Sequence, residues 1–208
     1  VAGTENIRTN TNATFLQNVN VGVAITAGKL GIGFTDSNIK VGNTALDSLT
    51  TGTLNTAVGH QALKANTTAA ANTAVGMDCM ISNTTGSANS AFGKDALYTN
   101  TTGSNNTAIG QESLFNNSTA SNNTAVGRQA LTANTTGANN TAVGYASLSS
   151  NTTAGSGAAF GYQALSANTT GEENAAVGRA ALGANTTGSF NTAVGKSALG
   201  ANTTASNN

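Results

Sequence analysis

The chain is poor in charge, in aromatic side chains and in proline. Only 8% of its 208 residues are charged and 4% are aromatic, and it has no proline and no tryptophan. Soluble domains usually carry about 25% charged residues, so on this surface amide and hydroxyl side chains must interact with water instead. The composition therefore argues against an ordinary globule.

Neither sign of charge dominates, and long apolar runs are missing. Eight Lys and Arg balance eight Asp and Glu, which gives no basic footprint for nucleic acid or for an anionic membrane surface. No stretch of about 18 apolar residues occurs, the length that a membrane-spanning helix needs. We therefore expect neither a nucleic-acid partner nor membrane insertion.

Reactive side chains are equally scarce. Cys79 is the only cysteine and His60 the only histidine, which excludes an intramolecular disulfide and a histidine-based metal cluster. Cys79 stands where other repeats have Ala or Ser, so we expect a small buried side chain. His60 holds a variable position and is expected to face solvent. We predict no catalytic residue, no cofactor and no enzyme activity.

What the sequence has is a repeat of seventeen residues. Its consensus reads Asn-Thr-Ala-Val-Gly, two variable residues, Ala-Leu, two variable residues, Asn-Thr-Thr-Gly and two variable residues. The fifth residue marks ten copies without insertion or deletion: Gly42, Gly59, Gly76, Gly93, Gly110, Gly127, Gly144, Gly161, Gly178 and Gly195. A fixed period of this kind is the signature of a solenoid or fibre. We divide the chain into residues 1–37 and a ten-repeat solenoid over 38–208.

The repeat predicts an all-β fold, a parallel β-solenoid or β-roll of ten 17-residue coils. Thr-Ala-Val suits a short strand, and the glycine after it permits a bend. Asn-Thr-Thr-Gly predicts a turn in which Asn tolerates a left-handed conformation and Gly supplies positive φ. The six residues between them, such as 162–167, fit either a helical turn or a second short strand.

Coils stacked at the strand spacing of about 4.8 Å bring equivalent residues into rows. We expect two apolar rows to be core. The first is Val58, Val75, Phe92, Ile109, Val126, Val143, Phe160, Val177 and Val194. The second is a leucine row that includes Leu63, Leu131 and Leu165. Alanines beside them mark where backbones approach closely.

An asparagine row follows from the same stacking, and it can hydrogen-bond its amides from coil to coil. Its members are Asn66, Asn83, Asn100, Asn117, Asn134, Asn151, Asn168, Asn185 and Asn202. Each of them except Asn117, which begins Asn-Ser-Thr, begins an Asn-Thr-Thr triplet, and both kinds of triplet are glycosylation acceptors in a eukaryotic secretory pathway. In a bacterial or phage protein these triplets are plain turns, and that is the interpretation we prefer.

Three surface rows leave alternatives open. Asp78, Asp95 and Glu112 fall on one row. Their carboxylates either bind a cation or have their mutual repulsion offset by neighbouring basic side chains. Tyr145 and Tyr162 occupy adjacent coils, and together with Arg179 they fit either sugar contact or plain surface. Regular threonines in the Asn-Thr-Thr turns fit either ice binding or ordinary turn chemistry.

The N-terminal region reads as additional β-structure. Val19, Val21, Val23 and Ile25 alternate with small or polar residues, and residues 30–34 alternate again, as expected for a hairpin or for two successive coils of a β-structure. The last repeat stops in phase, so we expect an uncapped coil with a bare strand edge. These four residues are our candidates for joining subunits, by adding a strand to that edge of the next chain.

The Asn-Thr-Ala-Val-Gly motif, at 106–110 and 191–195, resembles the Asn-Ser-x-Ala-Ile-Gly-type repeats of trimeric autotransporter adhesin heads. Those heads are left-handed parallel β-rolls of three chains. The fuller pattern with Asn-Thr-Thr-Gly is similar to repeats in bacteriophage tail-fibre proteins. The resemblance covers about residues 30–208 and implies a homo-oligomer outside the cell, on a cell surface or on a virion. The repeat here is longer than the adhesin repeat.

Two large apolar residues per coil make a thin core, which favours packing of several chains. We therefore expect an extracellular structural fibre that self-assembles, as a trimer or a head-to-tail polymer, into a filament or fibre shaft with adhesion as an added role. The alternative is an adhesin head that binds a receptor or a cell-surface glycan. An ice-binding protein is a further alternative.

Overall fold

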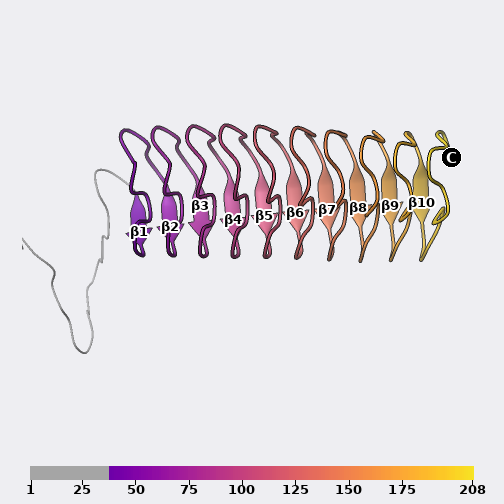
Figure 1. Ribbon diagram of the computed structural model, residues 1–208, viewed down its shortest axis with the longest axis horizontal. Helices are drawn as coiled ribbons and strands as arrows, with labels where there is room; N and C mark the ends of the chain where they lie inside the picture. Colours follow the sequence, from indigo (N-terminus) through magenta and orange to yellow (C-terminus); the bar gives the residue numbers. More distant parts are fainter. Residues whose placement is uncertain (1–37) are drawn as a thin grey trace, which may run out of the picture. The chain divides into compact units, whose positions relative to one another are not determined.

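A computed structural model describes residues 38–208, which form a parallel β-solenoid (Figure 1). Its strands are β1 (Ile39–Val41), β2 (Thr56–Val58), β3 (Thr73–Val75), β4 (Ser90–Phe92), β5 (Thr107–Ile109), β6 (Thr124–Val126), β7 (Thr141–Val143), β8 (Ala158–Phe160), β9 (Ala175–Val177) and β10 (Thr192–Val194). They pair in sequence order as one parallel sheet, each residue beside its equivalent in the next coil. This confirms the predicted all-β parallel solenoid.

The segment between strand and Asn-Thr-Thr turn forms neither a helical turn nor a second strand in residues 38–208. It is a run of turns in which Gln61 and Leu63 have positive φ, 57° and 52°, as do their equivalents in the following coils. The Leu63 N–H donates to the Cys79 carbonyl of the next coil at 3.0 Å, and the Gln61 N–H to Asn43 of the preceding coil at 3.0 Å. Hydrogen bonds between coils take the place of those that a helical turn would make.

The Asn-Thr-Thr-Gly turn also differs from expectation. Neither Asn134 nor Gly137 has positive φ; the left-handed residue is Asn139, two positions later, with φ 62°. At Gly137 the constraint is space, because an added Cβ would collide with the carbonyl oxygen of Ala154 in the next coil. The turn glycine therefore serves close stacking of coils.

The core lies between an alanine row and a leucine row. The strand alanines, such as Ala57, Ala125 and Ala159, are fully buried, and so are Leu63 and Leu131. Leu165 and the other row members from Met80 to Leu182 are buried as well. These two rows make one continuous apolar cluster along the solenoid.

The prediction that the valine row is core is wrong. Side chains alternate along a strand, so with Ala pointing inward the Thr and Val on either side of it point outward. Phe92, Ile109, Phe160 and Val177 are 40–43% exposed and Val194 is 73% exposed. The remaining row members, Val58, Val75, Val126 and Val143, are half-buried. The interior is already filled by leucine and asparagine side chains facing alanine.

Two buried asparagine rows hold each turn in place. The Asn134 amide nitrogen donates to the Asn117 Oδ1 of the preceding coil at 2.9 Å and to the Gly137 carbonyl at 2.9 Å. From the other side of the turn, the Asn123 amide donates to the same Gly137 carbonyl at 2.9 Å, and its Oδ1 accepts the Asn140 N–H at 2.9 Å. Within residues 38–208 every buried side-chain nitrogen and oxygen has a hydrogen-bond partner.

The row through Asn134 is the predicted amide ladder, from Asn66 to Asn202. The row through Asn123 was missed, although its signal is plain: an asparagine opens every repeat except the one that begins at Gly157. Both rows act on the same carbonyl. The pair therefore fixes the width of each coil as well as its register.

Gly157 interrupts that second row, and filling the gap is expected to stabilise the fold. The Gly157 N–H donates to Asn140 Oδ1 at 2.8 Å, but glycine has no amide to donate to the Gly171 carbonyl or to accept the Asn174 N–H. A Cβ at this position would lie 3.1 Å from Asn140 Oδ1, a side-chain atom that can shift. We expect Gly157→Asn to raise the free energy of unfolding by about 1 kcal/mol, through added hydrogen bonds and a less flexible unfolded chain.

Urea unfolding followed by circular dichroism measures this change. Ser156→Asn is the matched control, because Ser156 is exposed and has the left-handed conformation that Asn139 already adopts in another coil. The control should change stability by less than about 0.5 kcal/mol. A Gly157→Asn variant no more stable than the parent would contradict the assigned role of the row.

Candidate functional site

The variable side chains gather in two rows directly after the strands. The sixth-residue row follows the strand glycine and contains His60, Met77, Lys94, Gln111, Arg128, Tyr145, Tyr162, Arg179 and Lys196. The seventh-residue row contains Gln61, Asp78, Asp95, Glu112, Gln129, Ala146, Gln163, Ala180 and Ser197. Because every coil repeats the same backbone, each row is a continuous line of neighbours one strand spacing apart.

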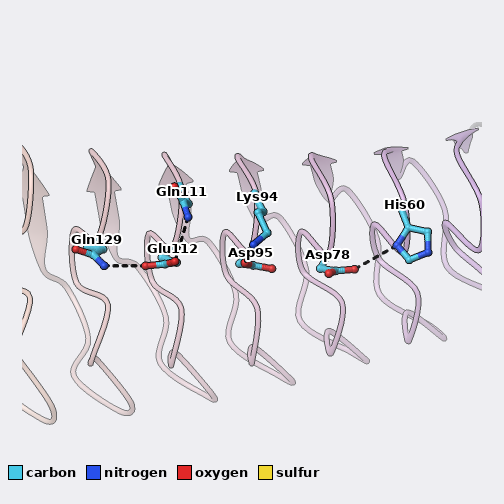
Figure 2. A network of polar contacts seen from close by, with 7 residues as sticks. All are labelled: His60, Asp78, Lys94, Asp95, Gln111, Glu112 and Gln129. Atoms are coloured by element: carbon cyan, nitrogen blue, oxygen red, sulfur yellow. Dashed lines mark hydrogen bonds and ion pairs between the residues drawn. The ribbon is translucent and has the colours of Figure 1, made fainter.

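The three acidic side chains of the seventh-residue row each have a polar partner of their own (Figure 2). His60 Nδ1 lies 3.5 Å from Asp78 Oδ1, and Lys94 Nζ lies 3.2 Å from Asp95 Oδ2. Glu112 accepts hydrogen bonds from two glutamines, the nearer of them Gln129 in the next coil at 2.8 Å. No three His, Cys, Asp or Glu side chains of residues 38–208 come together in a way that could hold a metal ion.

Cys79 lies inside the solenoid, next to the leucine row, as its alanine-like position predicted. It is fully buried, and its Sγ donates to the Ala91 carbonyl at 3.3 Å. Burial raises the pKa of the Cys79 thiol to about 12, and the negative charge of Asp95 acts in the same direction. The thiol therefore stays protonated at neutral pH and is a poor nucleophile.

Four successive members of the sixth-residue row form a stacked ladder on the surface, which we call the Arg–Tyr ladder: Arg128, Tyr145, Tyr162 and Arg179. The two tyrosine rings stack with centroids 5.2 Å apart and planes 18° from parallel. The Arg128 guanidinium lies 5.9 Å from the centroid of Tyr145, and the Arg179 guanidinium 5.8 Å from that of Tyr162. The sequence predicted the adjacent tyrosines, but the place of Arg128 at the other end was missed.

The threonines and sequons of the turn are largely committed to the fold. The Thr67 hydroxyl donates to the Thr84 carbonyl of the next coil at 3.2 Å, and Thr135 donates to Thr152 at 3.0 Å. The second threonine of each turn, such as Thr136, is exposed. The asparagines that begin the Asn-Thr-Thr triplets from Asn66 to Asn185 are buried, with their amide nitrogens already hydrogen-bonded. In the folded chain those amides are therefore closed to a glycosyl transferase.

The predicted subunit-joining residues Val19, Val21, Val23 and Ile25 lie outside the described residues. The hairpin and its joining role therefore stay predictions.

No protein-family model, curated protein or solved structure matches the chain. Across residues 38–208 no helix reaches the length and apolar character needed to cross a bilayer. The solenoid is of the fold type that the resemblance implied. Function has to be argued from the surfaces of the coils themselves.

Proposed function

We propose that this chain is a structural segment of an extracellular fibre, built by lateral association of copies of itself. The observation that carries the proposal is the outward valine row. Phe92, Ile109 and Phe160 are each about 40% exposed on the outer face of the sheet. Together with the half-buried valines they line that face along the solenoid, which is the mark of an interaction surface.

A second copy of the same chain is the partner that fits this face best. Its row has the same rise per coil, so side chains of two chains can interlock along the whole length without falling out of step. Nine steps of about 4.8 Å give a row about 43 Å long, and a three-residue strand is about 10 Å wide. Two such faces bury roughly 860 Å² in total, somewhat below the about 1,000 Å² expected of a specific interface, so side chains beside the row have to add to the contact.

The interior of the solenoid suits a load-bearing shaft. Backbone hydrogen bonds join every coil to the next, and two asparagine rows repeat the connection with side chains. Each coil contacts its neighbours in one fixed register, so the stack of coils is expected to be stiff along its axis. A low-charge surface of amides and hydroxyls is compatible with a position on a cell surface or a virion.

Scanning transmission electron microscopy of the purified chain tests the proposal through mass per unit length. We expect fibres with the mass of more than one chain in each length of roughly 48 Å, the span of ten coils. Replacing Phe92, Ile109 and Val126 together by threonine should leave the circular dichroism spectrum unchanged and give separate monomers. Parent protein that stays monomeric at high concentration would overturn the proposal.

A matched triple variant controls for the number of substitutions. Thr68, Thr102 and Thr136 are exposed turn residues at one equivalent position in different coils. Their replacement by valine alters a different face of the same coils. It should leave fibres intact, and loss of fibres in this variant would show that the sheet face is not the interface.

A further inference from the structure

We propose that the Arg–Tyr ladder binds a linear anionic polysaccharide, through carboxylate or sulfate groups that reach the two arginines. Its residues occupy the sixth position of the repeat, whereas the proposed fibre contact uses the fourth. Its ligand follows from which parts of the four side chains are covered and which are open.

The aromatic faces of the ladder are already occupied. Tyr145 and Tyr162 cover one face of each other, and Arg128 and Arg179 cover the outer faces. A neutral sugar or a nucleobase would need a free ring face for stacking. The groups that remain accessible to a ligand are the polar ends of the four side chains, in the order guanidinium, phenol hydroxyl, phenol hydroxyl and guanidinium. Both tyrosines are well exposed, at 38% and 46%.

Both arginines keep their charge for a ligand. Arg128 and Arg179 form no ion pair with any carboxylate of residues 38–208. A guanidinium over a ring, with no carboxylate partner, keeps N–H groups free to bind carboxylate or sulfate in the bidentate manner. The seventh-residue row beside the ladder is uncharged, with Gln129, Ala146, Gln163 and Ala180 in these four coils. This contrasts with the preceding coils, where Lys94 is paired with Asp95.

The spacing of the ladder selects an extended chain. The arginines are three coils apart, about 14 Å along the axis. Two phenol hydroxyls lie between them, and neither has a hydrogen-bond partner among the described residues. A chain of sugars with acidic groups at intervals and hydroxyls between them matches this order of charge and hydroxyl. Two arginines are few for a nucleic-acid site, which relies on many phosphate contacts.

Isothermal titration of the full chain with defined oligosaccharides tests the site. The probes are hexamers of galacturonate for carboxylate and sulfated dextran oligomers for sulfate, with unsulfated dextran and an oligothymidylate as comparisons. We expect binding to at least one acidic sugar, weakening with added salt, and none to neutral dextran. Preference between the two acidic probes identifies which group the arginines hold.

The double variant Arg128→Gln, Arg179→Gln should weaken that binding at least tenfold, and Tyr145→Ala should weaken it as well. Lys94→Gln is the control, since it removes a cation of the same row that is paired with Asp95, and it should change affinity less than twofold. Absence of binding to both acidic probes, an equal effect of the control, or tighter binding of oligothymidylate would overturn the proposal. Fibre mass per length stays a separate readout, so loss of sugar binding says nothing against the fibre.

Discussion

Gly127→Ala is expected to lower the free energy of unfolding by at least about 3 kcal/mol, more than most single substitutions cost. Gly127 has φ 133°, a conformation that side-chain-bearing residues rarely adopt. An added Cβ would lie 2.5 Å from the carbonyl oxygen of Gly144 and 2.7 Å from its carbonyl carbon. Both atoms are backbone of the next coil, so relief requires moving the coil itself.

A second glycine separates the two causes. Gly195 has a similar φ of 126°, but a Cβ there would meet only Ala198 Cβ, at 4.0 Å. Gly195→Ala therefore measures conformational strain without a collision and should cost about 1–2 kcal/mol. Urea unfolding of both variants, followed by circular dichroism, gives the difference. Equal losses would show that the coil spacing adjusts freely around Gly127, which contradicts the close stacking described above.

The seventeen-residue period was enough to predict the fold, because a regular repeat requires the backbone to repeat the same path. Equivalent residues that recur every seventeen positions without insertion have to occupy equivalent places, and only stacked coils provide them. Strand position followed from Thr-Ala-Val and the bend from Gly127-type residues. The turns did not follow, since left-handed residues such as Gln61 and Leu63 carry no local preference for that conformation. Their conformation comes from hydrogen bonds between coils.

The main error was the assignment of which side chains of the strand face the core, and it has a general cause. Alternation shows that Ala125 and Val126 point to opposite sides but does not say which side is inside. Side-chain size suggested Val126. The interior is narrow, however, because Leu131 and Asn134 enter it from the other walls of the coil and leave space only for a methyl group. The same error concealed the exposed apolar face that now supports self-association.

The candidate site could be predicted in part. Rows are visible in the sequence, so the adjacency of Tyr145 and Tyr162 needed only the period. The rest depends on rotamers: Lys94 turns toward Asp95, whereas Arg128 lies over a ring. No spacing rule distinguishes a paired cation from one stacked on an aromatic face. The free charge of the ladder is therefore a result of the structure alone.

Asn134→Asp is expected to destabilise the fold by about 3 kcal/mol at pH 7, and by clearly less at pH 3. The amide nitrogen of Asn134 donates to two acceptors, Asn117 Oδ1 and the Gly137 carbonyl. A carboxylate has the same shape but no hydrogen to donate, so it would face both oxygens with a buried negative charge.

The pH dependence follows from that charge. Burial and the two oxygens raise the pKa of the new carboxyl in the folded chain above its unfolded value of about 3.9. The folded state then binds more protons than the unfolded state, so the loss of stability grows as pH rises through these two values. Below about pH 3 the protonated carboxyl donates one hydrogen bond and recovers part of the loss.

Asn116→Asp, at an exposed site, is the control and should differ little from the parent at either pH. Urea midpoints at pH 3 and pH 7 decide the matter: an equal loss for Asn134→Asp at both would rule out the buried charge as its cause, and no loss at either pH would mean that the Asn134 amide donates nothing of consequence to the fold.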